Sequence, residues 1–266
     1  MVSATNELAL EAAIERALTG TNPQTSRSGE DVKQTPAEYD VANNGFEIGL
    51  PADFNIQYAI DEKLFWRFLE QTQAPQLERL KKNSPIDWQR KFLDRFDRLI
   101  KKHGILQLLK KGLSVDDAHF DLMYPAPLAS SSQSIKNNFE TNIFSCTRQV
   151  RYSLANPLQE IDMVLFLNGI SLITLELKNA WTGQTARYHG QKQYRDDRDA
   201  KQPLLNFGRC LVHMALDTDE VYMTTKLAGK STFFCPSIKA TTSVREIRPI
   251  LKVTKQPIYG KKYLPS

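Results

Sequence analysis

Two parts of the chain show the spacing of apolar residues that is typical of amphipathic helices. In residues 7–18 the apolar side chains recur every three or four positions, so they lie along one side of a helix. Thr5 or Asn6 can cap the start of this helix, and Gly20 can end it. The pattern therefore predicts a short N-terminal helix that packs through one face.

The second helical part spans residues 59–111, where aromatic and aliphatic residues at helical spacing alternate with dense lysine and arginine. Pro75 and Pro85 do not continue a helix, so we expect breaks close to both. The basic runs are residues 81–82, 98–102 and 110–111. They suit a solvated helix face, and they equally suit contact with phosphate groups or with a neighbouring domain. The sequence leaves these interpretations open.

Beyond about residue 119 the pattern changes to short apolar runs separated by turn residues, which predicts strands. In residues 160–178 two apolar runs flank Asn168-Gly169, a dipeptide that strongly favours a hairpin turn. Both faces of each run are apolar, as in a central strand that is covered on both sides. The chain is therefore predicted to be α/β, with a helical insertion between the first helix and the sheet.

Three charged residues, Asp162, Glu176 and Lys178, lie at the ends of these apolar runs. A carboxylate buried without a partner is costly, so acids in such strands are paired or bind a cation. Glu176 and Lys178 are two positions apart and share one strand face. Oxygen ligands around Mg²⁺ with a lysine beside the attacking water suit phosphodiester hydrolysis. The alternative is a surface ion pair, which the neighbouring Leu175 and Leu177 disfavour.

The length of the turn decides whether Asp162 and Glu176 can share a ligand. Directly opposed residues of two antiparallel strands lie on the same face of the sheet. A two-residue turn at Asn168-Gly169 would place the two carboxylates on opposite faces, whereas a three-residue loop, or a bulge in the first strand, would bring them together. We therefore predict an odd-length loop or a bulge, with Gly169 at positive φ.

The order of Asp162, the Asn-Gly turn and Glu176-Leu177-Lys178-Asn179 resembles the nuclease signature of the restriction (R) subunit of type I restriction-modification enzymes. These subunits belong to the wider class of Asp…(Asp/Glu)-x-Lys nucleases. The resemblance covers residues 135–240 well and residues 1–130 only loosely. The similar segments around the signature are residues 144–152, 182–185, 193–198, 203–207, 212–217 and 221–225.

The resemblance implies a restriction-endonuclease-like core, in which helices flank a central mixed sheet, and a metal-dependent endonuclease. Asp162 and Glu176 would bind Mg²⁺, with Mn²⁺ as a substitute, and the Leu177 carbonyl would add a third ligand. Lys178 would orient the attacking water or stabilise charge on the phosphorus. An acid on the first helix often joins such sites. Glu11 matches it best, and Glu15 is next.

Residues 186–200 are predicted to form a helix after the Glu-x-Lys strand. One face of it carries Arg187, Gln191, Tyr194 and Arg198. We expect this face to be exposed, and to contact DNA or support the site. R subunits carry a Gln-x-x-x-Tyr motif here. Tyr194 fits the tyrosine, but Gly190 stands at the glutamine position, with Gln191 and Gln193 nearby.

The resemblance also implies a place in a larger enzyme. Residues 1–240 would form the nuclease domain, with a core of about 1–20 and 118–240, an insertion of about 55–115, and an extension at 241–266. An ATP-driven translocase follows this domain in R subunits, so ATP is expected only for that motor. The expected partners are double-stranded DNA and the methyltransferase and specificity subunits. A repair or recombination nuclease with the same core, and a non-catalytic DNA-binding scaffold, are the alternatives.

Composition and short motifs change this picture little. The net charge of +5 permits nucleic-acid binding without requiring it. Three cysteines without metal-ligand spacing suit reduced thiols in a cytoplasm. The chain has no signal peptide and no long apolar run, so we expect a cytoplasmic protein without a membrane partner. Residues 227–232 imitate the end of a phosphate-binding loop, but Thr224 replaces its first glycine, and a turn is expected.

Overall fold

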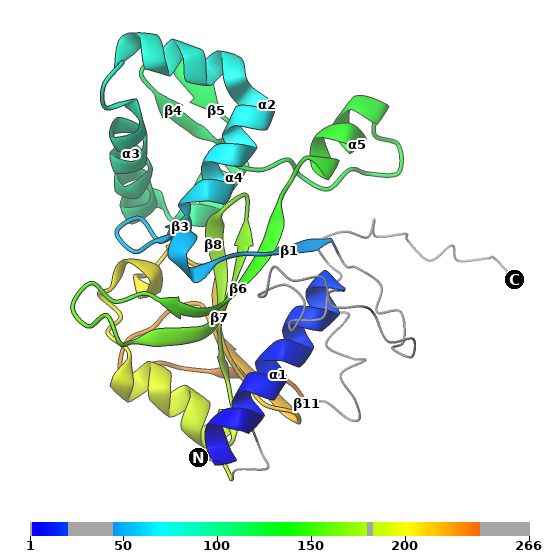
Figure 1. Cartoon of the computed structure of the whole chain (residues 1–266), viewed down its shortest axis with the longest axis vertical. Coiled ribbons are helices and arrows are strands. Elements are labelled where there is room, and N and C mark those ends of the chain that lie inside the picture. The colour runs from blue at the N-terminus through cyan, green and yellow to red at the C-terminus, as the bar shows by residue number, and fades with distance from the viewer. Residues whose placement is uncertain (1, 21–44, 180–182, 240–266) are drawn as a thin grey trace, which may run out of the picture.

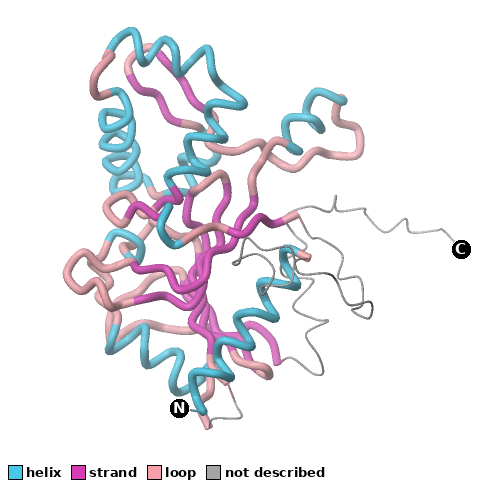
Figure 2. The backbone as a smooth tube through the Cα atoms, in the orientation of Figure 1, coloured by secondary structure: helices cyan, strands magenta, loops and turns pink. Residues whose placement is uncertain are grey.

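One mixed β-sheet runs through the middle of the molecule (Figure 2). The computed structural model describes residues 2–20, 45–179 and 183–239. The strands of the sheet are β1 Phe46–Ile48, β2 Phe54–Asn55, β3 Ile60–Asp61, β6 Phe144–Arg151, β7 Glu160–Leu167, β8 Ile170–Leu177, β9 Val212–Leu216, β10 Glu220–Thr224 and β11 Cys235–Lys239. They follow the order β1-β6-β7-β8-β9-β10-β11, and β3 pairs with both β2 and β8. The β1–β6 and β8–β9 pairs are parallel, and the other pairs are antiparallel.

Helical segments cover both faces of this sheet. On one face α1 Val2–Thr19 buries Ile14 and Leu18 against alternate residues of β7 and β8. On the other face two π-helical turns, η3 Ala186–Gly190 and η4 Gln193–Asp197, pack against the intervening residues of β7. A sheet covered on both sides explains why its central strands are apolar on both faces. The predicted α/β class, with helices flanking a central mixed sheet, is confirmed.

The N-terminal helix is longer than predicted. It begins at Val2, so the expected cap at Thr5 or Asn6 is wrong. Small polar residues are tolerated within a first turn, and a capping residue therefore does not by itself fix the start of a helix. The predicted end is confirmed, because Gly20 has φ 72° and its N–H donates to the Arg16 carbonyl at 2.8 Å.

The segment between β3 and β6 forms a helical insertion with its own apolar core, at the top of Figure 1. Its elements are α2 Glu62–Asn83, α3 Trp88–His103, α4 Ile105–Lys111, β4 Leu113–Val115 and β5 Ala118–Phe120. Both expected breaks are confirmed, because α2 kinks at Gln73, two residues before Pro75, and ends at Asn83. The β4–β5 hairpin was not predicted. The remaining short elements are η1 Pro51–Asp53, α5 Gln133–Glu140 and η5 Pro203–Leu205.

Three further expectations concern the ends and connections of the chain. Residues 227–232 form a turn between β10 and β11, as predicted, in which the Ala228 N–H donates to the Thr232 hydroxyl at 2.8 Å. The expected extension at residues 241–266 lies outside the described residues. Among the described helices, none has the length and apolar character needed to cross a membrane.

Candidate active site at the open end of the central hairpin

The connection between β7 and β8 sets the sheet face of each acid. Asn168 (φ 52°) and Gly169 (φ 75°) form a two-residue turn. Leu172 is then an extra residue in β8, because the pairs on either side of it differ in register by one. This bulge places Asp162 opposite Glu176, and the two carboxylates therefore share one face of the sheet.

The predicted irregularity exists and brings Asp162 and Glu176 onto one face, but its form differs from the one expected. The three-residue loop does not form, and the bulge lies in the second strand instead of the first, while positive φ at Gly169 is confirmed. Packing explains the tight turn. A Cβ on Gly169 would collide with the backbone of Asp61 and Phe65, and the Asn168 side chain accepts a hydrogen bond from the Ile143 N–H at 2.7 Å.

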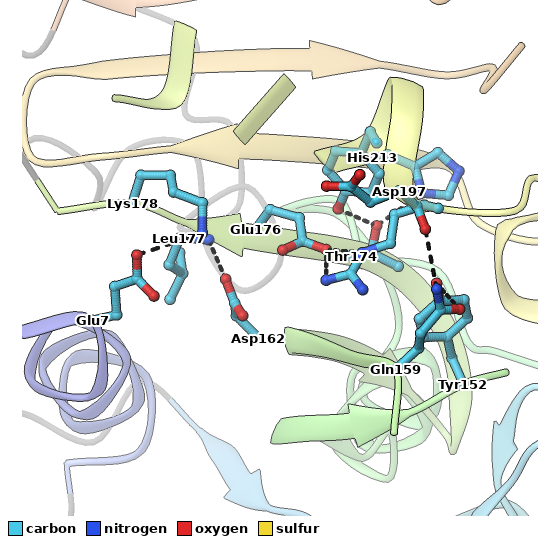
Figure 3. A network of polar contacts seen from close by, with 12 residues as sticks. Glu7, Tyr152, Gln159, Asp162, Thr174, Glu176, Leu177, Lys178, Asp197 and His213 are labelled. Carbon is cyan, nitrogen blue, oxygen red and sulfur yellow. Dashed lines mark hydrogen bonds and ion pairs between the residues drawn. The ribbon is translucent and has the colours of Figure 1, made fainter. Parts of the chain in front are cut away.

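Asp162 is fixed by the neighbouring strand. Its Oδ2 accepts a hydrogen bond from the backbone N–H of Leu177 at 2.6 Å. Burial raises the pKa of this carboxyl, although the positive charge of Lys178 and the Leu177 N–H act in the opposite direction. The carboxylate is thereby held at the end of β8, beside Glu176 (Figure 3).

Glu176 is completely buried. Its Oε1 accepts a hydrogen bond from Nε of Arg198 at 2.8 Å, and Nη2 of the same guanidinium lies 2.8 Å from this oxygen. Its Oε2 is buried without a hydrogen-bond partner among the described residues. Burial, and then the negative charge of Asp162, raise the pKa of Glu176 to about 8. One oxygen of a buried carboxylate is therefore left for a cation or a proton.

Lys178 is buried at the end of β8, and α1 supplies its counter-charge. The Lys178 Nζ lies 3.5 Å from Oε1 of Glu7 (Figure 3). Glu7 was not predicted as a site residue. A signal was present, because Glu7, Glu11 and Glu15 recur every four positions and so line one side of a helix.

The predicted helix acids, Glu11 and Glu15, are bound by an arginine. Nε of Arg148 on β6 donates to Glu11 at 2.9 Å, and its Nη1 donates to Glu15 at 3.2 Å. Burial is the main cause that raises the pKa of Glu11 to about 7, and the charge of Asp162 adds to it. These ion pairs anchor α1 on the sheet. A role of Glu11 as an additional active-site acid stays a prediction.

Tyr194 is buried, so the exposed position expected for it is wrong. Its hydroxyl lies 2.8 Å from Oγ1 of Thr174, which in turn lies 2.8 Å from Nδ1 of His213. Burial lowers the pKa of His213 to about 4, so this imidazole is neutral at physiological pH. Because Thr174 and Glu176 are two apart on β8, this hydroxyl network lies on the face that carries the acids.

The other polar residues in and beside η3 and η4 occupy different environments. Gln191 is buried, Arg187 is exposed, and Arg198 reaches Glu176. The wider turn of a π-helix separates residues that would share a face in an α-helix. At Gly190 a Cβ would lie 2.9 Å from the Ala215 Cβ, so close packing on β9 leaves no space for the glutamine of the related motif.

The donor set at this site fits a hard cation. Within residues 2–20, 45–179 and 183–239, no three histidine, cysteine, aspartate or glutamate side chains form a metal cage. Asp162 and Glu176 nevertheless share a face, the charge of Asp162 adds to burial in raising the pKa of Glu176, and Oε2 of Glu176 is unbonded. Two carboxylates, completed by water and by a backbone carbonyl such as that of Leu177, are ligands that suit Mg²⁺. The carbonyl ligand stays a prediction.

The sheet topology and the position of the acids first indicate a class of protein fold. A central mixed sheet flanked by helices is the architecture of a restriction-endonuclease-like core. Residues 26–232 match the family described as Type I restriction enzyme R protein N terminus. The match covers most of the chain, and the protein therefore belongs to this family. A comparison with curated proteins found no match.

Proposed function

We propose that this chain is the Mg²⁺-dependent endonuclease domain of a type I restriction enzyme R subunit. It would hydrolyse phosphodiester bonds of double-stranded DNA after ATP-driven translocation by a motor domain. The observation that carries this proposal is the pair Asp162 and Glu176, a partly buried and a completely buried carboxylate on one sheet face, with Oε2 of Glu176 unbonded. Membership of the R-subunit family favours restriction over a repair nuclease with the same core.

Each side chain of the site has a distinct task in this proposal. Asp162 and Glu176 would hold Mg²⁺, which when bound polarises the phosphate and lowers the pKa of a water molecule. The Leu177 N–H holds the carboxylate of Asp162, and the Arg198 guanidinium holds that of Glu176. Lys178 would orient the attacking water or stabilise the negative charge that develops on the phosphate oxygens.

The buried hydroxyl network would act by positioning. Tyr194 has no exposed surface for DNA, so we propose that it supports β8 through Thr174. Arg187 is exposed at the start of η3 and remains available for a DNA phosphate. The methyltransferase and specificity subunits of the same system would be the protein partners, and the cytoplasm would be the compartment.

The test compares cleavage with motor activity in the assembled restriction enzyme. Asp162→Asn and Glu176→Gln should abolish cleavage of a supercoiled plasmid in Mg²⁺ or Mn²⁺, while ATP hydrolysis and translocation continue. Glu160→Gln is the matched control, because Glu160 begins the same strand but is partly exposed and paired with Arg151 at 3.0 Å. Undiminished cleavage by Asp162→Asn would refute the proposed site and favour a non-catalytic scaffold.

A further inference from the structure

The positive charge of this protein is concentrated in the helical insertion. Residues 79–111 contain eleven lysines and arginines against three aspartates, a net charge of +8, whereas the whole chain carries +5. The rest of the chain is therefore net negative. Such a local excess of one charge sign indicates a surface for an oppositely charged partner more directly than the total does.

Within this segment α3 presents a regular basic face. Its apolar side is buried through Phe92, Phe96 and Ile100, which fixes the orientation of the helix. The exposed residues Arg95, Arg98 and Lys102 recur at intervals of three and four positions, so they form one stripe. This stripe, which we call the α3 basic face, rises roughly 10 Å along the helix axis.

The α3 basic face is not neutralised by the acids of its own helix. Asp94 contacts the Tyr58 hydroxyl and Arg90, and Asp97 contacts Arg209 and Lys101. In the part of the chain that the structure describes, no carboxylate lies within ion-pair distance, 4.0 Å, of Arg95, Arg98 or Lys102. The Arg98 Nε donates to the backbone carbonyl of Asp94 at 3.3 Å.

We propose that the α3 basic face binds the phosphate backbone of a DNA duplex at a distance from the site of cleavage. The choice of DNA rests on the proposed function. Two of the three residues are arginines, whose planar guanidinium groups match phosphate oxygens. A duplex offers a continuous line of phosphates, which suits a stripe of evenly spaced positive charges.

The contact would add affinity and leave the chemistry unchanged, because the two regions lie at opposite ends of the central hairpin. Gly169, at one end of β8, packs against the start of α2 in the insertion, and Glu176 lies at the other end. A strand of eight residues spans roughly 25 Å, which is about seven base pairs of B-form DNA.

Salt-dependent binding of the full chain to a 30-base-pair fluorescent duplex tests this surface. The variant Arg95→Gln/Arg98→Gln/Lys102→Gln should bind about tenfold or more weakly, and the slope of log K against log [salt] should fall by about 2 to 3. The control variant Lys63→Gln/Arg67→Gln/Lys81→Gln loses the same charge. Its residues already face Asp53, Glu47 and Glu78, so its binding should change much less. Unchanged thermal unfolding of both variants shows that the fold is retained.

The outcomes separate this surface from the active site. Asp162→Asn should bind the duplex with undiminished affinity while losing cleavage in the assembled enzyme. Equal loss of affinity in both triple variants would overturn the proposal, because only overall charge would then matter. Undiminished duplex binding by the α3 variant, with loss of its co-purification with the other subunits, would also overturn it in favour of docking onto a neighbouring protein.

Discussion

Unfolding of the metal-free protein should become easier as pH rises, and Glu176 should account for much of the change. The pKa of this carboxyl is raised from 4.5 to about 8 by burial and by the charge of Asp162. A proton is therefore bound more tightly in the folded state than in the unfolded state. Its contribution is fully present below pH 4.5 and is lost as pH rises through 8. At about 1.4 kcal/mol per pKa unit, the loss between pH 5 and 8 is about 3 to 4 kcal/mol.

Glu176→Gln isolates this contribution. Glutamine has nearly the same volume and keeps a carbonyl oxygen that can accept from Arg198, but it does not ionise. Any change in the hydrogen bond to Arg198 shifts the stability of Glu176→Gln by an amount that does not depend on pH, so the slope is the diagnostic quantity. Glu11 and Asp61, whose pKa values are raised to about 7 and about 6, contribute the same slope to both proteins. The difference between the two curves therefore belongs to Glu176.

The assay is urea unfolding in EDTA, followed by circular dichroism at several pH values from 5 to 8. The free energy of unfolding of the wild type should fall relative to Glu176→Gln by about 3 to 4 kcal/mol over this range. Added Mg²⁺ at pH 8 should stabilise the wild type, because a cation replaces the lost proton, and should leave Glu176→Gln unaffected. Parallel curves for the two proteins would refute the reasoning.

Further substitutions test the surroundings of the site. Tyr194→Phe should cost about 1 kcal/mol of stability by urea unfolding, because it removes one hydrogen bond, whereas Tyr194→Ala should cost about 3 to 5 kcal/mol through a cavity. Equal effects would contradict the buried position of the ring. Gly190→Ala should lower the melting temperature, because its Cβ would lie 2.9 Å from that of Ala215, and an unchanged value would contradict this packing. Glu7→Gln should reduce plasmid cleavage less than Lys178→Ala does, since Glu7 only positions the amine.

The acids of the site could be predicted from sequence, because charge is rare in strands that are apolar on both faces. The same apolar character on both faces made the register of the two strands, and so the relative position of the acids, unpredictable. A strand with one polar face reveals any shift of register, whereas β7 is apolar from Met163 to Leu167 and β8 carries only Ser171 and Thr174 as polar residues before Glu176. The bulge at Leu172 therefore could not be located from the pattern of apolar residues. Only the requirement that Asp162 and Glu176 share one sheet face indicated that an irregularity exists.

The environment of the following helix could not be predicted for a related reason. A helix that turns polar residues toward a buried polar site has the same composition as one that turns them toward solvent. Tyr194 was therefore expected to be exposed, and Arg198 was expected to face DNA instead of Glu176. The π-helical turns added a second difficulty, because they change the angular spacing on which the expected face was built.

The irregular features of the hairpin and the proposed chemistry are physically connected. A regular two-residue hairpin would separate Asp162 from Glu176, and each carboxylate would then avoid the charge of the other. The bulge brings them together on a covered face, where burial and then the charge of Asp162 raise the pKa of Glu176. Arg198 and Lys178 offset part of this repulsion, but Oε2 of Glu176 stays buried and unbonded. A divalent cation between the two acids would remove the repulsion and bond this oxygen, so the least favourable feature of the metal-free site is also the one that favours metal binding.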